Sequence, residues 1–268
     1  MAPSRPVLRW HGGKWKLAPF IVEHLPAHRI YVEPFGGAAS VLLRKPRAFA
    51  EVYGDLDGEV VNLFRMVRDR GEELGQALAL TPYAEDEFLD AQEPAQDPLE
   101  RARRLCVRSF MGLGASGATQ RVGFRRDILR RGTSPATDWH RFPTALAEVV
   151  ERLRGVVIEN RDAAEVMVFH DSPETLHYVD PPYLAASRDR GRDYRHELTD
   201  QDHESLAEVL QGLKGMVVLS AYEHPVYDRL YKGWPQIRCR SFADGGRVRE
   251  EVLWFSPNCP SAGLFEAV

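Results

Sequence analysis

Residues 176–182 read LHYVDPP, an apolar run that ends in one acid and two prolines. Because proline has no backbone N–H, Pro181 and Pro182 cannot continue a central strand, and they hold their neighbours in extended geometry. The stretch therefore predicts a strand that ends at a stiff corner and presents Asp180 there. An ordinary turn that ends a strand has the same pattern. The neighbouring motifs must therefore show whether this corner is only a turn or part of a functional site.

The segments around this corner alternate between strand and helix patterns. The amphipathic stretch 202–215 predicts a helix that ends at glycine, and the apolar run 215–222 predicts the next strand. Five more stretches have strand character: 29–34, 50–57, 156–160, 236–242 and 249–256, the last two as an antiparallel pair. This alternation predicts an α/β fold with a doubly wound, mostly parallel, seven-stranded sheet and a site at the carboxyl ends of its strands.

The alternation is interrupted between residues 82 and 154, after a periodic stretch at 59–78 that predicts one helix. We expect a mainly helical insertion with a flexible glycine-rich loop, between catalytic parts at 1–81 and 155–268. From Arg101 to Arg131 there are nine arginines and one acid, a charge of +8 in a chain whose net charge is −4. Such a segment indicates local contact with a polyanion, although a solvated helix face has the same composition.

Composition narrows the class of protein. The 44% hydrophobic content is typical of a globular core, and no apolar run is long enough to cross a bilayer. Residues 1–16 contain no apolar signal-peptide core, and the three cysteines form no disulfide framework. The nine histidines show no metal-ligand spacing. We therefore expect a cytoplasmic protein without a metal or a membrane contact.

Candidate site residues follow four strands in chain order. After the first, Gly36-Gly37 allows close approach of backbone to a ligand, and a helix N-terminus follows. Asp55 follows the second strand, where doubly wound folds can place an acid on ribose hydroxyls, and Asp57 is suited to cap a helix. Asp162 follows the third strand, and a loop acid is the alternative. Each signal alone is modest, but their order, with Asp180 after the fourth strand, is specific.

These motifs resemble the Dam-like adenine-N6 DNA methyltransferases (D12 class), in which the cofactor motif comes first and DPPY late. The likeness spans nearly the whole chain and includes RWHGGKWKL at 9–17, EPFGG at 33–37, GDLD at 54–57, DPPY at 180–183 and EEVLWFSP at 250–257. It implies the class I fold of methyltransferases that use S-adenosylmethionine (SAM). It also implies that the partner is double-stranded DNA, and we expect a monomer.

The resemblance also implies where the cofactor lies. SAM would sit over the Gly36-Gly37 turn, with Lys14 near its methionine end, Asp55 at its ribose and Asp162 at its adenine edge. Ala39 departs from the family, where many relatives have glycine or serine, but its side chain is small. The implied cofactor residues are Trp10, Gly13, Lys14, Glu33, Pro34, Phe35, Gly36, Gly37, Asp55, Asp162 and Asp180.

The corner at 180–183 then has a chemical purpose. The exocyclic amine of adenine is a poor nucleophile because its lone pair is delocalised into the ring. Asp180 and the Pro181 carbonyl would accept hydrogen bonds from this amine and orient its lone pair, while Pro182 keeps the corner rigid. Tyr183 would stack against the base, which must be turned out of the duplex to reach such a pocket.

DNA contacts are expected in two places. Arg121, Arg125 and Arg126 lie in the insertion, and Arg188, Arg192 and Tyr194 lie in the charged stretch after DPPY, for which a solvated loop is the alternative. Rival functions are methylation of cytosine N4, of RNA or of a protein glutamine, and a catalytically inactive nucleic-acid-binding module. A nicotinamide oxidoreductase is disfavoured because EPFGG lacks the phosphate-binding fingerprint.

Overall fold

The computed structural model describes residues 2–127, 132–187, 194–242 and 248–260. Within them one sheet has the strand order β3-β2-β1-β4-β5-β7-β6, and all seven predicted strands are present. The strands are β1 (Ile30–Glu33), β2 (Ala50–Gly54), β3 (Val156–Glu159), β4 (Thr175–Val179), β5 (Met216–Tyr222), β6 (Gln236–Phe242) and β7 (Val248–Phe255). β1 to β5 pair in parallel, whereas β7 is antiparallel to both β5 and β6.

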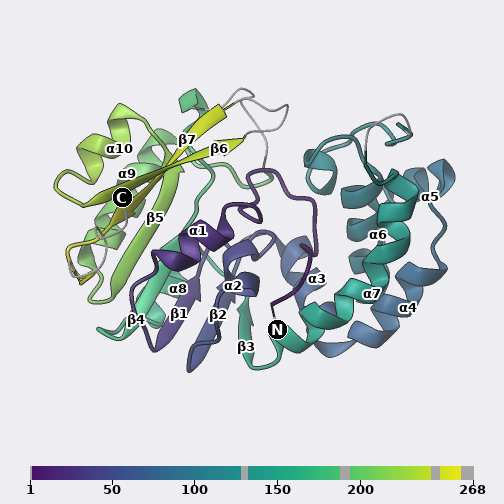
Figure 1. Cartoon of the computed structure of the whole chain (residues 1–268), viewed down its shortest axis with the longest axis horizontal. Helices are drawn as coiled ribbons and strands as arrows, with labels where there is room; N and C mark the ends of the chain where they lie inside the picture. Colours follow the sequence, from purple (N-terminus) through teal and green to yellow (C-terminus); the bar gives the residue numbers. More distant parts are fainter. Residues whose placement is uncertain (1, 128–131, 188–193, 243–247, 261–268) are drawn as a thin grey trace.

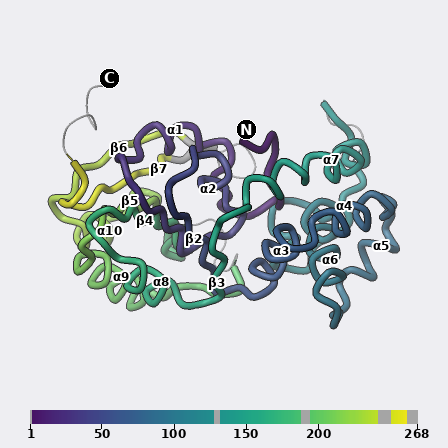
Figure 2. Tube along the Cα trace, turned by 90° about the horizontal axis from the view of Figure 1, so that it is seen from below, coloured from purple at the N-terminus to yellow at the C-terminus, as the bar shows by residue number. Residues whose placement is uncertain are grey.

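Helices cover both faces of this sheet. On one side lie α1 (Ala18–Glu23) and α2 (Ser40–Arg44), and on the other lie α8 (Ala163–Phe169), α9 (Asp200–Gly212) and α10 (Pro225–Leu230), as Figure 2 shows. The period of two along a strand divides the core between these layers. In β5, Met216 and Val218 join the cluster that contains α1 and α2, and Val217 and Leu219 join the one that contains α9 and α10.

The parallel pairing brings the ends of distant segments to one edge. Val32 of β1 lies opposite Val52 of β2 on one side and His177 of β4 on the other. The residues that follow these strands therefore leave the sheet at the same edge. The helices after β2 and β3 begin at aspartates whose side chains cap them, Asp57 and Asp162, so the capping role expected for Asp57 is confirmed.

A group of helices packs beside the sheet, at the right of Figure 1. It consists of α3 (Gly58–Asp69), α4 (Gly71–Leu80), α5 (Glu85–Asp90), α6 (Pro98–Met111) and α7 (Pro135–Leu153). The prediction of a single helix over 59–78 was wrong, because the chain breaks at Arg70, between α3 and α4. Gly71 begins α4, and a Cβ on it would lie 2.4 Å from Val150 of α7. Glycine at this position therefore lets α4 pack closely on α7.

The glycine-rich stretch of this region is a compact loop rather than an open one. Leu113 N–H donates to the Gly123 carbonyl, and Arg125 N–H donates to the Met111 carbonyl. Added Cβ atoms on Gly112 and Gly117 would lie 2.6 Å and 2.3 Å from the Arg108 carbonyl oxygen. The glycines therefore let the loop pack closely against the end of α6. The loop contains the short 3₁₀ turn η1 (Ser116–Ala118). None of the described helices is long and apolar enough to span a bilayer.

A buried ion cluster joins the helical region to the sheet. Arg152, near the end of α7, donates to Glu51 of β2 from Nη1 at 2.6 Å, and Lys45 Nζ lies 2.8 Å from the same carboxylate. All three side chains are nearly fully buried. Burial opposes ionisation of Glu51, but the two cations hold its pKa below the usual value.

We predict that Arg152→Ala lowers the free energy of unfolding by about 3–5 kcal/mol, because it leaves a buried carboxylate with one of its two cations removed. Arg154→Ala is the control, since that side chain is 70% exposed and pairs with an equally exposed Glu151; its loss should change stability by less than about 0.5 kcal/mol. Urea denaturation measures both. Equal effects of the two substitutions would contradict a structural role for the buried cluster.

Candidate active site

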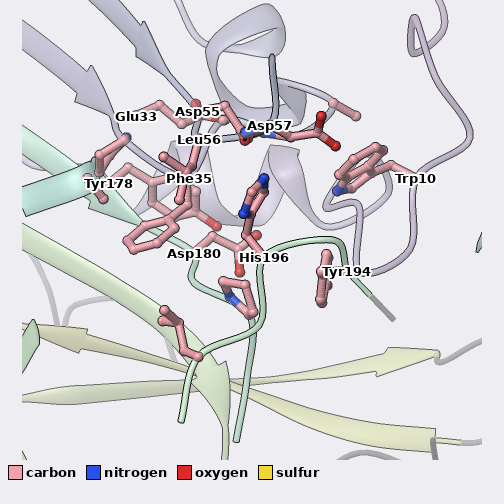
Figure 3. A pocket seen from close by; sticks show the side chains of 18 of the residues that line it. Trp10, Glu33, Phe35, Asp55, Leu56, Asp57, Tyr178, Asp180, Tyr194 and His196 are labelled. Atoms are coloured by element: carbon pink, nitrogen blue, oxygen red, sulfur yellow. Dashed lines mark hydrogen bonds between the residues drawn. The ribbon is translucent and has the colours of Figure 1, made fainter. Parts of the chain in front are cut away.

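A cavity of about 280 Å³ opens at the carboxyl edge of the sheet (Figure 3). Its wall combines the loop before α1, the ends of β1, β2 and β4, the start of α8 and one face of α9. All eleven residues expected to bind the cofactor line it: Trp10, Gly13, Lys14, Glu33, Pro34, Phe35, Gly36, Gly37, Asp55, Asp162 and Asp180. The sequence therefore identified residues that the fold brings together, although they span 171 positions of the chain, from 10 to 180.

The Gly36-Gly37 turn has no room for side chains. A Cβ on Gly36 would lie 2.2 Å from a ring carbon of Tyr53, and one on Gly37 would lie 2.8 Å from Nε1 of Trp10. Gly37 also has a φ of 46°, a conformation that favours glycine. Ala39 follows with a φ of 52°, so the departure from the family pattern places alanine in a left-handed conformation at the start of α2.

Two acids lie at the ends of β1 and β2: Glu33, the buried last residue of β1, and the half-buried Asp55 directly after β2. Asp55 accepts hydrogen bonds from the backbone N–H of Gly37 at 2.7 Å and of Asp57 at 2.8 Å. Burial nevertheless raises its pKa to about 6. Glu33 accepts from the Tyr31 hydroxyl at 2.7 Å and the Leu42 N–H at 2.8 Å, and burial raises its pKa to about 8. The inner end of the cavity therefore has a local excess of acids.

Asp180 lies at the inner end of the cavity, directly after β4. Its Oδ1 is 3.0 Å from Lys14 Nζ and accepts the Tyr183 hydroxyl at 2.9 Å. Burial raises the pKa of Asp180 to about 6, although the Lys14 charge opposes that rise. For Lys14, burial favours the neutral amine, but the charges of Asp180 and Glu251 outweigh it and raise its pKa. The lysine is therefore a fixed cation between acids.

Two other residues of the corner, Pro181 and Tyr183, are more enclosed than Asp180. Pro182 lines the cavity, whereas Pro181 is buried behind it. Tyr183 is 6% exposed; the Lys14 ammonium lies 4.8 Å from its ring centroid, and Tyr222 packs against it edge-on. Stacking of a base on Tyr183 stays a prediction, and it would need access to the ring beyond these contacts.

A segment after the corner forms part of the cavity wall that the sequence did not predict. His196 lies between Asp180 and Asp57 in Figure 3. Arg195 Nη1 is 3.1 Å from Asp57, and its Nη2 donates to the Ala118 carbonyl in the helical region. Tyr194, expected at the DNA, lines the cavity with its ring centroid 6.5 Å from that of Trp10. Arg188 and Arg192 lie outside the described residues.

The arginine cluster is partly neutralised inside the protein. On α6, Arg101 pairs with Glu59, Arg103 with Glu87 and Glu100, and Arg104 with Glu100. Arg121 and Arg126 are exposed and pair with Glu93 and Glu85. The charge of +8 counted along the sequence therefore overstates the free positive charge of this surface, because its acidic partners lie elsewhere in the chain.

Arg125 faces a different surface. It lines a hollow together with Arg9, which precedes the cavity loop, and Arg141 of α7. Asp138 and Glu148 also line this hollow. The sequence did not single out Arg9 or Arg141, since neither lies within the cluster.

Behind Asp180, two residues that the sequence did not single out complete the site. Glu251 of β7 is 3% exposed and accepts from the Tyr183 hydroxyl and, at 2.7 Å, from Ser220 Oγ of β5. An acid at a buried position of a strand is a signal that sequence reasoning could have used. Within the described residues, no group of His, Cys, Asp and Glu is arranged to hold a metal ion.

The strand order and a cavity lined by glycines and acids at the carboxyl edge define a class I methyltransferase fold. A family model for D12 class N6 adenine-specific DNA methyltransferases matches residues 10–238. The chain belongs to this family, and it is an enzyme that methylates adenine in DNA.

Similar proteins agree with this assignment. A DNA adenine methylase of Salmonella typhi is 30% identical over 225 residues, which cover 80% of this chain and 78% of that protein. A DNA adenine methylase of Escherichia coli K12 is 28% identical over 223 residues, with the same coverage. The type II methyltransferase M1.LlaDCHI of Lactococcus lactis subsp. cremoris is 26% identical over 255 residues, 85% of this chain and 84% of that protein.

We predict that Gly36→Ala lowers the free energy of unfolding by about 1–3 kcal/mol, because the new methyl group would overlap the Tyr53 ring. Gly75→Ala in α4 is the matched control: a Cβ there meets no atom within 4 Å, so it should stabilise by up to about 1 kcal/mol through helix propensity. Thermal and urea unfolding give both values. A Gly36→Ala variant as stable as the Gly75→Ala variant would show that the turn adapts.

Proposed function

We propose that the chain takes its methyl group from SAM and transfers it to the N6 amino group of an adenine turned out of double-stranded DNA. The observation that carries the proposal is the position of Asp180, a hydrogen-bond acceptor that lines the same cavity as the Gly36-Gly37 turn and Asp55. Family membership supports a methyl donor and DNA. The identity of the donor and the roles of the residues are the proposal.

The residues around the cavity fit a nucleoside joined to an amino acid. Both oxygens of Asp55 are held by backbone N–H groups, so its carboxylate has a fixed direction suited to a pair of ribose hydroxyls. The backbone of Gly36 and Gly37 is bare, which permits close approach of a ligand. The residues that would hold SAM are Trp10, Gly13, Lys14, Glu33, Pro34, Phe35, Gly36, Gly37, Asp55 and Asp162. When bound, SAM supplies a methyl group on a positively charged sulfur.

The side chains of the corner would prepare the adenine. Asp180 and the Pro181 carbonyl accept hydrogen bonds from the amino group, which favours a nitrogen whose lone pair points toward the methyl donor. The negative charge of Asp180 also stabilises positive charge that develops on this nitrogen. The two prolines keep the acceptors in place. Since this corner lies inside a cavity, the base must leave the duplex to reach it.

We assign target recognition to the region 82–154 and its surroundings. Arg121 and Arg126 are exposed there, and the hollow lined by Arg9, Arg125 and Arg141 adds positive charge. The acids that pair with Arg121 and Arg126 are themselves exposed, by 68% and 47%, so a phosphate can replace them at small cost. Arg103 and Arg104 are less exposed than Arg121 and Arg126, and we assign their ion pairs with Glu100 to stabilisation of the helical region.

We predict that Asp180→Asn reduces the single-turnover rate of methyl transfer by at least about 100-fold, because the charge that stabilises the reacting nitrogen is lost. Cofactor affinity should change little. For the wild type, kcat at saturating SAM should fall below pH 6, since protonation of Asp180, whose pKa is about 6, removes its acceptor. Labelled methyl transfer to duplex DNA between pH 5 and 8, with the product nucleosides identified by mass spectrometry, measures both.

Asp228→Asn, at an exposed position of α10, is the control and should keep the wild-type rate and pH profile. Retained turnover with loss of SAM binding in Asp180→Asn would overturn the assignment of roles. N4-methylcytosine as the product would overturn the choice of base.

We predict that the double substitution Arg125→Ala with Arg126→Ala weakens binding to duplex DNA and reduces the salt dependence of log K by about 1 for each lost phosphate contact. The control removes two exposed arginines near the opposite edge of the sheet, Arg47→Ala with Arg154→Ala. Fluorescence anisotropy over a salt series measures both slopes. The same slope in both double variants would place the DNA surface elsewhere.

A further inference from the structure

The buried carboxylate of Glu251 has no part in the mechanism described so far. It lies on β7, 3% exposed, and does not line the cavity. Three donors converge on its Oε1: the Tyr183 hydroxyl, Ser220 Oγ at 2.7 Å and Lys14 Nζ at 3.6 Å. Two of these donors, Tyr183 and Lys14, also contact Asp180. Glu251 is therefore connected to Asp180 through shared partners without touching it.

The Tyr183 hydroxyl has one hydrogen and two carboxylate acceptors within reach; Ser220 Oγ lies farther away, at 3.3 Å. Asp180 Oδ1 lies 2.9 Å from this hydroxyl, and Glu251 Oε1 is closer. A phenol donates only one hydrogen bond, so Tyr183 cannot serve both carboxylates at once. Asp180 Oδ1 already receives Lys14 at 3.0 Å. If the phenol donated there too, both lone pairs of that oxygen would be used.

The Lys14 charge is divided in the same way. Its ammonium lies between Asp180 and Glu251, and its third contact is the Gly12 carbonyl at 2.9 Å. Without Glu251, one carboxylate would attract the whole charge. A carboxylate that is fully paired with a lysine is a weaker acceptor for a neutral amine and stabilises developing positive charge less.

We propose that Glu251, supported by Ser220, is a positioning residue for methyl transfer. It takes the phenol hydrogen of Tyr183 and part of the Lys14 charge, so that Asp180 Oδ1 keeps a lone pair for the adenine amino group. The inference rests on the proposed function, because it concerns the amine that Asp180 receives. It assigns a role to β5 and β7, which the reaction does not otherwise use.

A buried acid that serves only the core would behave differently. Its loss would lower stability, and the rate would fall by the same factor at every pH. A positioning role also changes the titration of Asp180, because Glu251 is one of the charges that face it. The others are Lys14 from the loop before α1 and Glu33 from β1. Tyr178, Tyr183 and His196 are the other titratable neighbours.

The test is Glu251→Gln, which keeps the shape and an acceptor oxygen but removes the charge. Glu250→Gln is the matched control: it makes the same change one residue away, at an exposed position of the same strand. We expect the single-turnover rate of Glu251→Gln at pH 7.5 to fall roughly tenfold, the value of one charge-assisted hydrogen bond. The acidic limb of its pH profile should move to lower pH, since the negative charge that raises the pKa of Asp180 is gone. The control should change neither.

A double-mutant cycle with Tyr183→Phe separates this pathway from general damage. If Glu251 acts through the phenol, the combined loss should be smaller than the product of the two single losses by at least about threefold. Should Glu251→Gln fail to fold, Ser220→Ala removes one donor from the same carboxylate. It should slow transfer about two- to fivefold, less than Glu251→Gln, because one neutral hydrogen bond is lost.

The outcomes distinguish the inference from the proposed function. A wild-type enzyme that transfers no methyl group from SAM to adenine contradicts the proposed function. An active wild type, together with a Glu251→Gln variant of unchanged rate and unchanged pH profile, contradicts only the positioning role. Losses that multiply fully in the cycle, or a Ser220→Ala variant with the wild-type rate, contradict it as well.

Discussion

The parallel alignment of β1, β2 and β4 is the constraint on which this site depends. Each strand delivers one acid to the same edge: Glu33, Asp55 and Asp180. Because the sheet and its helices exclude water there, burial raises the pKa of all three carboxyl groups. Lys14 balances part of this charge from a loop that precedes the sheet. The fold thus creates an acidic pocket, which suits the proposed transfer from a positively charged methyl donor to an amine.

The helical region has two functions that the charge of its sequence does not separate. Its less exposed arginines hold the helices to one another, and Arg152 ties α7 to β2 through Glu51. Its exposed arginines pair with acidic side chains that are also exposed to solvent, and such surface ion pairs are weak. Arg195 connects this region to the cavity, because it contacts both Asp57 and the Ala118 carbonyl. The helical region proposed for target recognition therefore contacts the wall of the candidate active site.

Much of the fold and of the site follows from local patterns. The seven strands could be predicted because alternating and continuous apolar patterns can be recognised in each segment without knowing which strands pair. The residues proposed to hold the cofactor could be named because the order of glycines, acids and prolines after successive strands resembles a family pattern, and the fold brings all of them to one cavity. The break at Arg70 could not be predicted, since the helical period continues through it and only the contact with Val150 of α7 requires Gly71.

The sequence alone determined the class of sheet, the edge that carries the site and the identity of its acids, because these depend on short-range periodicity and on residue type. Only the tertiary structure decided how charges are paired. Glu251 lies 68 residues from Tyr183, and nothing near either residue indicates that they meet. The same holds for Arg101 and Arg103 of α6, which pair with Glu59 of α3 and Glu87 of α5. Electrostatic energy depends on distance and burial in space, and a count along the chain contains neither.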